Sequence, residues 1–449
     1  MLNSSRRAPL ALSAAIAITI AAGTPARADT DSVAWGITEG LTTEVGPRPA
    51  GSAAEARARE WAKAKLTALG FSNVRIEPFT MRGYVRGEDR ASLVAPYVQP
   101  LAITALGYSG ATPAAGIEAE LVYFRTLDAL KAAPEGSLAG KIAFIDHAMR
   151  PTQDGSGYGP YGQVRRAGPA IAAGKGAVGV VIRSIGTDNH RVPHTGVTRF
   201  PDGVTPIPAG AVSGPDADLI ARVAGRGEPM RLSLTLTGET HENMPSGNVV
   251  GELIGRDPSL PAILVACHLD SWDLGTGAID DAAGCGIVTD AALRAQVGNR
   301  ALRTIRVLWA GSEEVGAFGG DAYAQAHGGE KHALAMESDF GADRIWKVEY
   351  RLGARNAALR ERLTVALGEM GIVAQDGTAG GGADVGAIIA AQKLAVIDMG
   401  QDGTHYFDLH HTADDTLDKV DPAALEQNAA AWARVLSIVA NEEGTISGQ

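Results

Sequence analysis

The sequence predicts an α/β fold, a mainly parallel mixed sheet sandwiched by helices, into which a second and smaller α/β domain is inserted. From residue 246 onward, apolar strand-like runs alternate with helix-like segments, which is typical of a parallel sheet with helices on both faces. Between residues 110 and 239 a shorter stretch alternates in the same way but holds no cluster of catalytic residue types. Hydrophobic residues make up 45% of the chain and charged residues 20%, which indicates a folded protein rather than a disordered one.

The first 28 residues have the features of a secretory signal peptide. Arg6 and Arg7 precede the apolar run 8–22, and Ala26-Arg27-Ala28 fits a small-x-small cleavage site. That run is too short to cross a membrane, and no later stretch reaches about eighteen uninterrupted apolar residues. We therefore expect a periplasmic or secreted protein with no membrane span in the mature chain; an N-terminal anchor is the alternative.

Charge and cysteine content exclude several classes of protein. The formal net charge is −11, and the leader contains three arginines and no acid, so the mature chain would carry −14. Such a charge disfavours nucleic acids and anionic membranes as partners. Cys267 and Cys285 are the only cysteines, too few for a disulfide scaffold. We expect both to be buried free thiols, although an oxidising compartment would permit one disulfide between them.

The N-terminal part of the mature chain is predicted to be scaffold. Residues 31–48 form an apolar-periodic segment that ends in a Gly-Pro-Arg-Pro sequence. Apolar residues at helical spacing predict a helix over 51–70, and Gly70 suits the position just after the end of a helix. A strand is expected over 72–79, so that this helix and strand would pack on the main sheet.

The middle segment, residues 110–239, is predicted to be a compact α/β unit. Its expected elements are strands 140–146, 177–182, 207–212 and 231–236 and helices 163–175 and 214–223. A bend or break is expected in the first of these helices at Gly168-Pro169. The unit resembles the protease-associated domain, which is commonly inserted into secreted peptidases, through its Gly-Lys-Ile strand, its small-residue helix-to-strand step and its Ile-Pro-Ala segment.

Loops of this unit carry no predicted role in the chemistry. His190 and His194 are expected to be solvent-exposed loop histidines. The glycine- and tyrosine-rich loop 154–161 is expected to be an ordinary surface loop, with an active-site lid as the alternative.

Strands and helices alternate through the second half of the chain. The expected strands are 247–254, 262–267, 304–310, 332–336 and 393–399, and the expected helices are 281–297, 319–326, 357–370 and 422–441. The main domain would then comprise residues 29–109 and 240–449, with the middle unit inserted in one of its loops.

Acids and histidines follow the strands of this second half. They are His268, Asp270, Asp280, Asp281, Glu313, Glu314, Glu337, Asp339, His410 and His411. The carboxyl ends of parallel strands meet at one sheet edge, and charges buried there must be paired or bound to metal. Imidazole and carboxylate are good zinc ligands, and two metals about 4 Å apart need a bridging carboxylate. The sequence therefore predicts a two-metal hydrolytic site.

The ordered set HxD, DD, EE, ESD and HHxxxDT resembles that of the co-catalytic zinc exopeptidases of the bacterial aminopeptidase and glutamate carboxypeptidase II type. The resemblance rests on the stretches CHLDSWDLGTGAIDDAAG, SEEVGAFG, MESD and HHTADDT, together with GPRPAGS near residue 46, and it covers nearly the whole mature chain. It implies a zinc-exopeptidase fold and two Zn²⁺ as cofactors. The metal ligands that it implies are His268, Asp280, Glu314, Asp339 and His411.

Within that set the resemblance also assigns roles. Asp280 would bridge the two ions, and Glu313 would be the general base. Glu337 is a rival of Asp339, but the family spacing favours Asp339. His411 is preferred to His410 because it stands four residues before the Asp-Thr pair of the motif.

Neighbouring residues are expected to support the site. Asp270, two residues from His268, can hold the other imidazole nitrogen. Simple aminopeptidases of this type often have tyrosine before the last histidine ligand, whereas this chain has His410, so His410 or Tyr406 could polarise the scissile carbonyl. Asp281 would form, with the residue before it, the strained Asp–Asp peptide that such sites show. The glycine-rich run 378–384 is expected to line the substrate pocket, a helix-entry turn being equally consistent.

The expected function is hydrolysis of a peptide bond near a free terminus, in which Glu313 takes a proton from water and passes it to the leaving amine. Similar members of the family act on unblocked dipeptides, so a dipeptidase is the first reading and a plain aminopeptidase the second. The rivals from other classes are a non-catalytic, receptor-like binding ectodomain on the same fold and a metal-dependent amidohydrolase or cyclase. Short peptides are the expected partners, and the sequence leaves a homodimer open.

Overall fold

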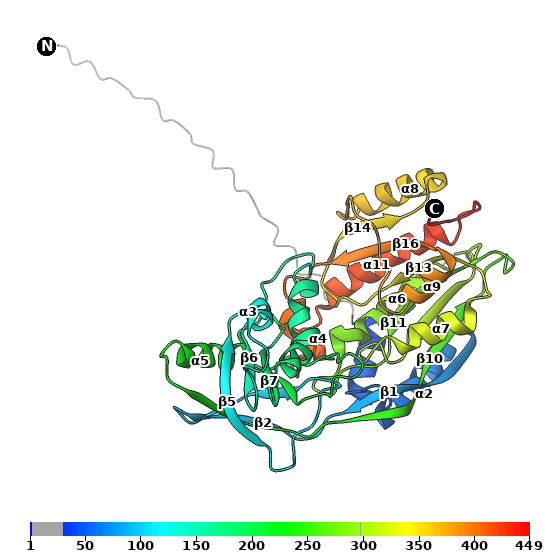
Figure 1. Cartoon of the computed structure of the whole chain (residues 1–449). Coiled ribbons are helices and arrows are strands. Elements are labelled where there is room, and N and C mark those ends of the chain that lie inside the picture. Colours follow the sequence, from blue (N-terminus) through cyan, green and yellow to red (C-terminus); the bar gives the residue numbers. More distant parts are fainter. Residues whose placement is uncertain (2–29, 297) are drawn as a thin grey trace.

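The computed structural model describes residues 1, 30–296 and 298–449. The predicted leader therefore lies, apart from Met1, outside the described residues. The described chain forms two eight-stranded mixed sheets with helices packed on them, which is the predicted α/β class (Figure 1). Among the described helices, none combines the length and the apolar character needed to cross a lipid bilayer.

The first sheet contains the strands of the second half of the chain. In spatial order its strands are β1 (Ser72–Val85), β10 (Glu239–Leu253), β12 (Ile305–Ala310), β11 (Ala262–His268), β13 (His332–Glu337), β16 (Ala395–Gln401), β14 (Ile345–Arg351) and β15 (Val373–Ala374). The four strands β12, β11, β13 and β16 are parallel, and β1, β10 and β14 each run antiparallel to the strand on their inner side. Parallel strands place their carboxyl ends at one edge, where ligands bind in such sheets.

Helices cover both faces of this sheet. On one face lie α1 (Val33–Gly40), α2 (Ala53–Ala68), α6 (Ala283–Arg294), α8 (Ala357–Gly368) and α11 (Pro422–Val439), and on the other lie α7 (Phe318–His327) and α9 (Gly386–Gln392). Side chains alternate along β11, so Val265 and Cys267 pack in the first core and Leu264 and Ala266 in the second. Burial on both faces explains why β11 is an unbroken apolar run in the sequence.

The second sheet belongs to the inserted unit. Its strands in spatial order are β3 (Gln99–Leu101), β2 (Asp89–Ala95), β9 (Met230–Leu236), β5 (Ile117–Phe124), β6 (Ile142–Ile145), β7 (Gly179–Arg183), β8 (Ala209–Val212) and β4 (Ile103–Ala105), and its helices are α3 (Leu127–Ala132), α4 (Tyr158–Gly174) and α5 (Gly214–Ala224). The paired strands β1 and β10 lead into and out of it (Figure 1). This sheet thus begins at residue 89, ahead of the expected start of the unit at 110. The earlier strands pair with β9 and β8, which are distant in the chain, so local pattern gave no sign of them.

Two helices differ from their predicted form. α4 begins at Tyr158 and continues through Gly168 and Pro169 without the expected break. Both residues are buried, and Gly168 packs so closely on Ile145 that a Cβ there would lie 2.8 Å from its side chain. Tertiary packing therefore outweighs the intrinsic tendency to break. α6 begins at residue 283 rather than 281, because Asp281 and the residue before it leave helical backbone angles.

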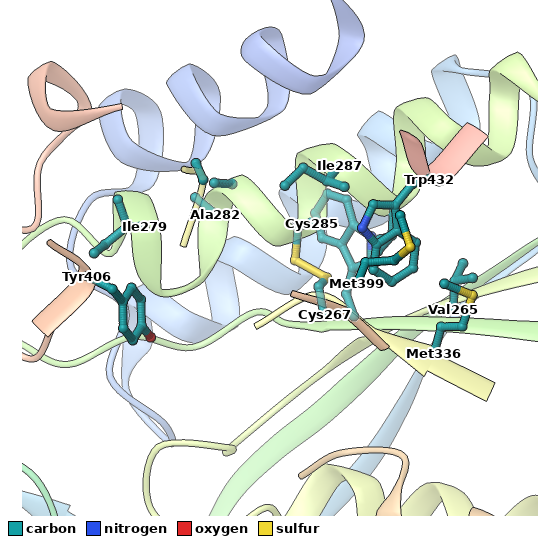
Figure 2. Close-up of a cluster of buried hydrophobic side chains, with 14 of the residues drawn as sticks. Val265, Cys267, Ile279, Ala282, Cys285, Ile287, Met336, Met399, Tyr406 and Trp432 are labelled. Carbon is teal, nitrogen blue, oxygen red and sulfur yellow. A yellow bond between two sulfur atoms is a disulfide. The ribbon is translucent and has the colours of Figure 1, made fainter. Parts of the chain in front are cut away.

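The expectation of free thiols is wrong, because Cys267 and Cys285 form a disulfide. The two Cα atoms lie 5.1 Å apart, a spacing that suits the bond. Figure 2 shows the bond inside the apolar core, close to Trp432 and Met399. It ties the end of β11 to the first turn of α6. The turn that brings Cys285 back over the strand could not be read from two cysteines alone.

Replacing both cysteines by alanine is expected to lower the free energy of unfolding by about 3 kcal/mol, because the disulfide closes a short loop and limits the unfolded chain. Guanidinium unfolding of the double variant and the wild type would measure the difference. Wild type unfolded with a reductant present should lose a similar amount. A loss below about 1 kcal/mol in both experiments would contradict a disulfide that stabilises the chain.

Candidate metal centre

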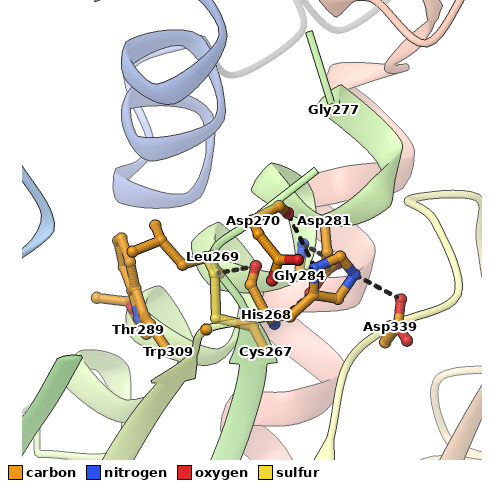
Figure 3. The surroundings of a disulfide bond; sticks show 12 residues. Cys267, His268, Leu269, Asp270, Gly277, Asp281, Gly284, Thr289, Trp309 and Asp339 are labelled. Atoms are coloured by element: carbon orange, nitrogen blue, oxygen red, sulfur yellow. Dashed lines mark hydrogen bonds and ion pairs between the residues drawn. A yellow bond between two sulfur atoms is a disulfide. The ribbon is translucent and has the colours of Figure 1, made fainter. Parts of the chain in front are cut away.

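The predicted site residues meet at the carboxyl edge of the first sheet. They lie at the ends of β11, β12 and β13, in the turn 278–282 before α6, and just after the short helix α10 (Tyr406–Leu409). Figure 3 shows the imidazole of His268 between the strand end and Asp339, with Asp270 and Asp281 beside it. The structure therefore brings together side chains that are far apart in the sequence, as the parallel strand order predicts.

Asp280 lies between two imidazoles. Its Oδ1 is 3.0 Å from His268 Nε2, and its Oδ2 is 3.5 Å from His411 Nε2. Its peptide bond to Asp281 is cis. A carboxylate that faces one imidazole with each oxygen is in the position of a bridge between two metal ions.

A further carboxylate accompanies each imidazole. Asp339 Oδ1 is 3.3 Å from His268 Nε2, and Glu314 Oε2 is 3.0 Å from His411 Nε2. The donors therefore fall into two sets that share Asp280. Cys267, Asp281 and Cys285 also lie close together, but the disulfide removes both thiolates from that group as metal ligands.

Each imidazole is held from behind by a backbone carbonyl. His268 Nδ1 donates to the Asp270 carbonyl at 3.0 Å, and the Asp270 carboxylate is further away, at 3.7 Å. That carboxylate instead accepts the backbone N–H groups of Glu313 and Glu314, at 3.0 and 3.3 Å. Asp270 thus supports His268 through its main chain and fixes the acids after β12 through its side chain. His411 Nδ1 lies 3.2 Å from the carbonyl of Thr195, which leaves Nε2 free to face the acids.

Arg48 and Asp415 hold the turn that carries Asp280. Arg48 is fully buried, and its guanidinium donates to the carbonyls of Leu269, Thr276 and Gly277 at 2.5, 2.6 and 3.0 Å. Asp415 Oδ1 accepts the N–H groups of Ala278 and Ile279, at 2.7 and 2.8 Å. In the sequence, the segments that contain Arg48 and Asp415 indicate the family resemblance but not that these two residues hold the turn.

The charge balance of the site fits divalent cations. In the described part of the chain, none of its acids is ion-paired with lysine or arginine, and two buried oxygens, Asp280 Oδ2 and Glu314 Oε1, accept no hydrogen bond. Burial, with Asp280 close by, raises the pKa of Glu314 well above its usual value. Burial lowers the pKa of His411 to about 3, so its Nε2 carries a lone pair. Carboxylates and the neutral imidazole of His411 are donors of the kind that zinc binds.

Glu313 lines the cavity without a partner for its carboxylate among the described residues. Its backbone is fixed by Asp270, whereas its side chain points into the space that the metal-ligand candidates surround. Burial, with Asp339 close by, raises the pKa of Glu313 well above its usual value. A carboxylate with a raised pKa and no fixed partner can exchange a proton with a bound molecule.

His410 and Tyr406 also reach the cavity. The ring of His410 stacks on that of His411 with centroids 3.5 Å apart, and its Nε2 is 3.7 Å from Asp280 Oδ2. Its Nδ1 accepts or donates no hydrogen bond among the described residues. His411 makes the shorter contacts to the acids.

The glycine-rich run 378–384 lines two cavities and also leads into a helix. Ala383 lines the cavity of the metal-ligand candidates, and Gly381 and Gly382 line an adjoining one. The same run leads into α9 and offers N–H groups at residues 383–385 to Glu337, at 2.8 to 3.0 Å. Glu337 is therefore turned to that backbone, and it is Asp339 that contacts His268.

The inserted unit closes one side of the site, contrary to what its loops suggested. His194 is buried rather than exposed, with Nδ1 2.7 Å from the His410 carbonyl and Nε2 2.6 Å from Asp188 Oδ1. Thr195 N–H donates to the His411 carbonyl at 3.0 Å. His190 is exposed, as expected. The segment after α10 is thus held by the inserted unit as well as by the main domain.

The loop 154–161 is not an ordinary surface loop. Gly155 packs against Phe340, and the ring of Tyr158 stacks on Phe407 with centroids 4.7 Å apart. Tyr158 also accepts a hydrogen bond from Arg165 at 2.5 Å. The sequence predicted no role for Tyr158 or Arg165, and its one signal was the adjacent pair Arg165-Arg166 on a helix otherwise rich in small residues.

A cavity of about 380 Å³ lies over the site. The metal-ligand candidates and Glu313 form its floor, aromatic residues of α10 and Tyr158 at the start of α4 form one wall, and arginines of the inserted unit form another. This volume is in the range of small-molecule sites.

Comparisons with known proteins agree with this geometry. The model of peptidase family M28 matches residues 248–436. Carboxypeptidase Q of Bos taurus is 33% identical over 410 residues, which cover 90% of this chain and 84% of that protein. The crystal structure of a peptidase M28 precursor from Shewanella amazonensis is 45% identical, with a TM-score of 0.89 over 92% of this chain and 94% of that one.

A more distant likeness concerns the fold. The zinc aminopeptidase BSAP from Bacillus subtilis superposes with a TM-score of 0.63 at 18% identity, over 92% of this chain and 97% of that one. Coverage of this extent includes the inserted unit as well as the main sheet.

Proposed function

We propose that this metallo-exopeptidase, which belongs to peptidase family M28, holds two zinc ions and hydrolyses unblocked dipeptides. The observation that carries the proposal is the position of Asp280 between His268 and His411, each with one further carboxylate. The proposed ligands are His268 and Asp339 for one ion and His411 and Glu314 for the other, with Asp280 shared.

The chemistry follows from what these residues can do. Zinc ions in this position would act as Lewis acids on the scissile carbonyl and lower the pKa of a nearby water towards about 7. Glu313 takes a proton from the attacking water and delivers it to the amine nitrogen as the carbon–nitrogen bond breaks. His410 and Tyr406 line the same cavity, with His410 stacked on His411, and either could donate a hydrogen bond to the carbonyl oxygen.

The preference for dipeptides is supported by the shape of the cavity and by the relatives. The inserted unit closes one side of the cavity, which limits the length of a bound peptide. The match to carboxypeptidase Q covers 90% of this chain and 84% of that protein, so it includes both units of this chain. An aminopeptidase of broader specificity is the second candidate, because the structural neighbour BSAP is a zinc aminopeptidase of the same fold. A non-catalytic, receptor-like ectodomain is disfavoured because the base and all five proposed ligands are present.

Export and domain organisation are part of the proposal. A leader over residues 1–28 would direct the chain to the periplasm or outside the cell, and the Cys267–Cys285 disulfide is consistent with such an oxidising compartment. The zinc peptidase domain would comprise about 29–88 and 237–449, with the protease-associated-like unit between them. A homodimer stays a prediction, which the elution volume of the purified chain would test.

The substrate class is tested with one dipeptide in four forms: unblocked, N-acetylated, C-amidated, and extended by three residues at its C-terminus. The zinc-loaded protein is expected to cleave the unblocked form with a kcat/KM at least about 10-fold above each of the others, since each blocked form loses one charged contact. Release of the free amino acid is measured alongside the zinc content. Equal cleavage of the extended peptide would favour the aminopeptidase, and cleavage of no form by zinc-loaded protein would refute the peptidase proposal.

A further inference from the structure

Arginines of the inserted unit line the cavity beside the proposed metal ligands. Arg165 and Arg166 lie on α4, and Arg199 lies in the loop between β7 and β8. The Arg199 N–H donates to the Arg166 carbonyl at 2.9 Å, which holds that loop on the helix. Arg165 Nη1 is 3.4 Å from His411 Nδ1, so this basic wall begins directly behind one of the proposed ligands.

These guanidinium groups lack carboxylate partners in the described part of the chain. Arg165 donates to the Thr195 carbonyl and the Tyr158 hydroxyl, and Arg166 donates to the Gly159 carbonyl at 2.7 Å. The Arg199 side chain contacts no hydrogen-bonding partner among the described residues. Other partly buried arginines, at positions 86, 183 and 306, are each ion-paired with an acid, whereas Arg48 and Arg303 use their N–H groups on backbone carbonyls.

The arrangement also has an electrostatic cost. Burial lowers the pKa of Arg166, and the neighbouring charges of Arg165 and Arg199 lower it further. The three cations line one wall of the cavity, where Arg199 is exposed and Arg166 makes one hydrogen bond, so an anion between these two side chains would offset the repulsion. The planar fork of arginine matches a carboxylate in a bidentate way.

We propose that Arg166 and Arg199 bind the free α-carboxylate of the substrate and thereby select dipeptides. This inference rests on the proposed function and names the group that the site recognises. In a dipeptide the carboxylate is separated from the scissile carbonyl carbon only by the amide nitrogen and one Cα. A carbonyl placed over Asp280 and Glu313 therefore puts the carboxylate within the same cavity, whose remaining charged wall is the arginine one. Arg165 is a positioning residue, because its N–H groups are used by Thr195 and Tyr158.

The kinetic test uses the double variant Arg166→Gln/Arg199→Gln. Its kcat/KM for the unblocked dipeptide is expected to fall by about 100-fold, because two charge-assisted contacts are lost, while that for the C-amidated dipeptide changes by less than about 3-fold. The matched control is Arg222→Gln, an exposed arginine on α5 of the same unit, which should leave both values unchanged. Equal losses on the two substrates, or no loss on the unblocked one, would overturn the inference.

A binding test separates this inference from the proposed function. In the zinc-loaded Glu313→Gln protein, calorimetry should show that the unblocked dipeptide binds at least about 10-fold more tightly than its amide, and that adding the two arginine changes abolishes the difference. Such a result would support carboxylate recognition even if the wild-type chain hydrolysed neither compound, in which case the peptidase proposal alone would fail. Equal affinity for the dipeptide and its amide in the Glu313→Gln protein would overturn the inference.

Discussion

Replacing Glu313 by glutamine is expected to lower kcat on the unblocked dipeptide by about 10³-fold while the zinc content stays unchanged. Glutamine has the size of glutamate but cannot take a proton from water. The Glu313 carboxylate makes no hydrogen bond or ion pair with another described residue, so the substitution breaks neither. Its backbone N–H, which binds Asp270 at 3.0 Å, is retained in the variant. Steady-state kinetics and elemental analysis of the same preparation measure both quantities.

The control for this variant is Glu369→Gln, an exposed glutamate at the end of α8, which should keep full activity. Two outcomes would contradict the proposed role of Glu313. Activity within about 3-fold of wild type would show that another group accepts the proton. A loss of zinc together with activity would show that Glu313 is a metal ligand rather than the base.

The positions of three proposed ligands could be predicted from strand order, whereas Asp280 lies in the turn before α6 and His411 follows α10. Each of His268, Glu314 and Asp339 follows an apolar run that the sequence identifies as a buried strand, and parallel strands bring such residues to one edge. Residue types alone did not distinguish Asp339 from Glu337 as the ligand. In the structure Glu337 accepts hydrogen bonds from the N–H groups of residues 383–385, so its carboxylate is turned to that backbone rather than to His268. The catalytic and ligand roles themselves stay predictions.

The contributions of the inserted unit could not be predicted, because they depend on contacts between residues far apart in the chain. His194 looks like a loop histidine in the sequence and becomes buried only when it meets the carbonyl of His410. Strands β2 and β4 lie ahead of residue 110 and join the second sheet through β9 and β8, which are distant in the chain, so local pattern did not indicate them. The disulfide between Cys267 and Cys285 likewise could not be predicted, because it depends on the turn that places the start of α6 beside the end of β11.

The second large effect is expected for His268→Ala, which should reduce zinc affinity by more than about 100-fold and abolish detectable hydrolysis. Residues that only support a metal ligand typically contribute 10- to 100-fold to affinity, so loss of a ligand itself should cost more. The alanine also leaves Asp280 and Asp339, which lie 3.0 and 3.3 Å from the imidazole, without their shared cationic or metal-bound partner. Zinc content after dialysis against a weak chelator, measured beside kcat, tests the expectation.

A matched variant distinguishes loss of the ligand from general damage to the fold. His332 is also a buried histidine on a strand of the first sheet, where it contacts Tyr323 and Gln392 rather than the acids. His332→Ala should therefore lower the free energy of unfolding by about 1–3 kcal/mol and keep its zinc. If His268→Ala retained the zinc content and affinity of wild type, His268 would not be a ligand, and the two-ion arrangement around Asp280 would have to be abandoned. If both variants lost zinc equally, the metal would depend on the integrity of the sheet rather than on this imidazole.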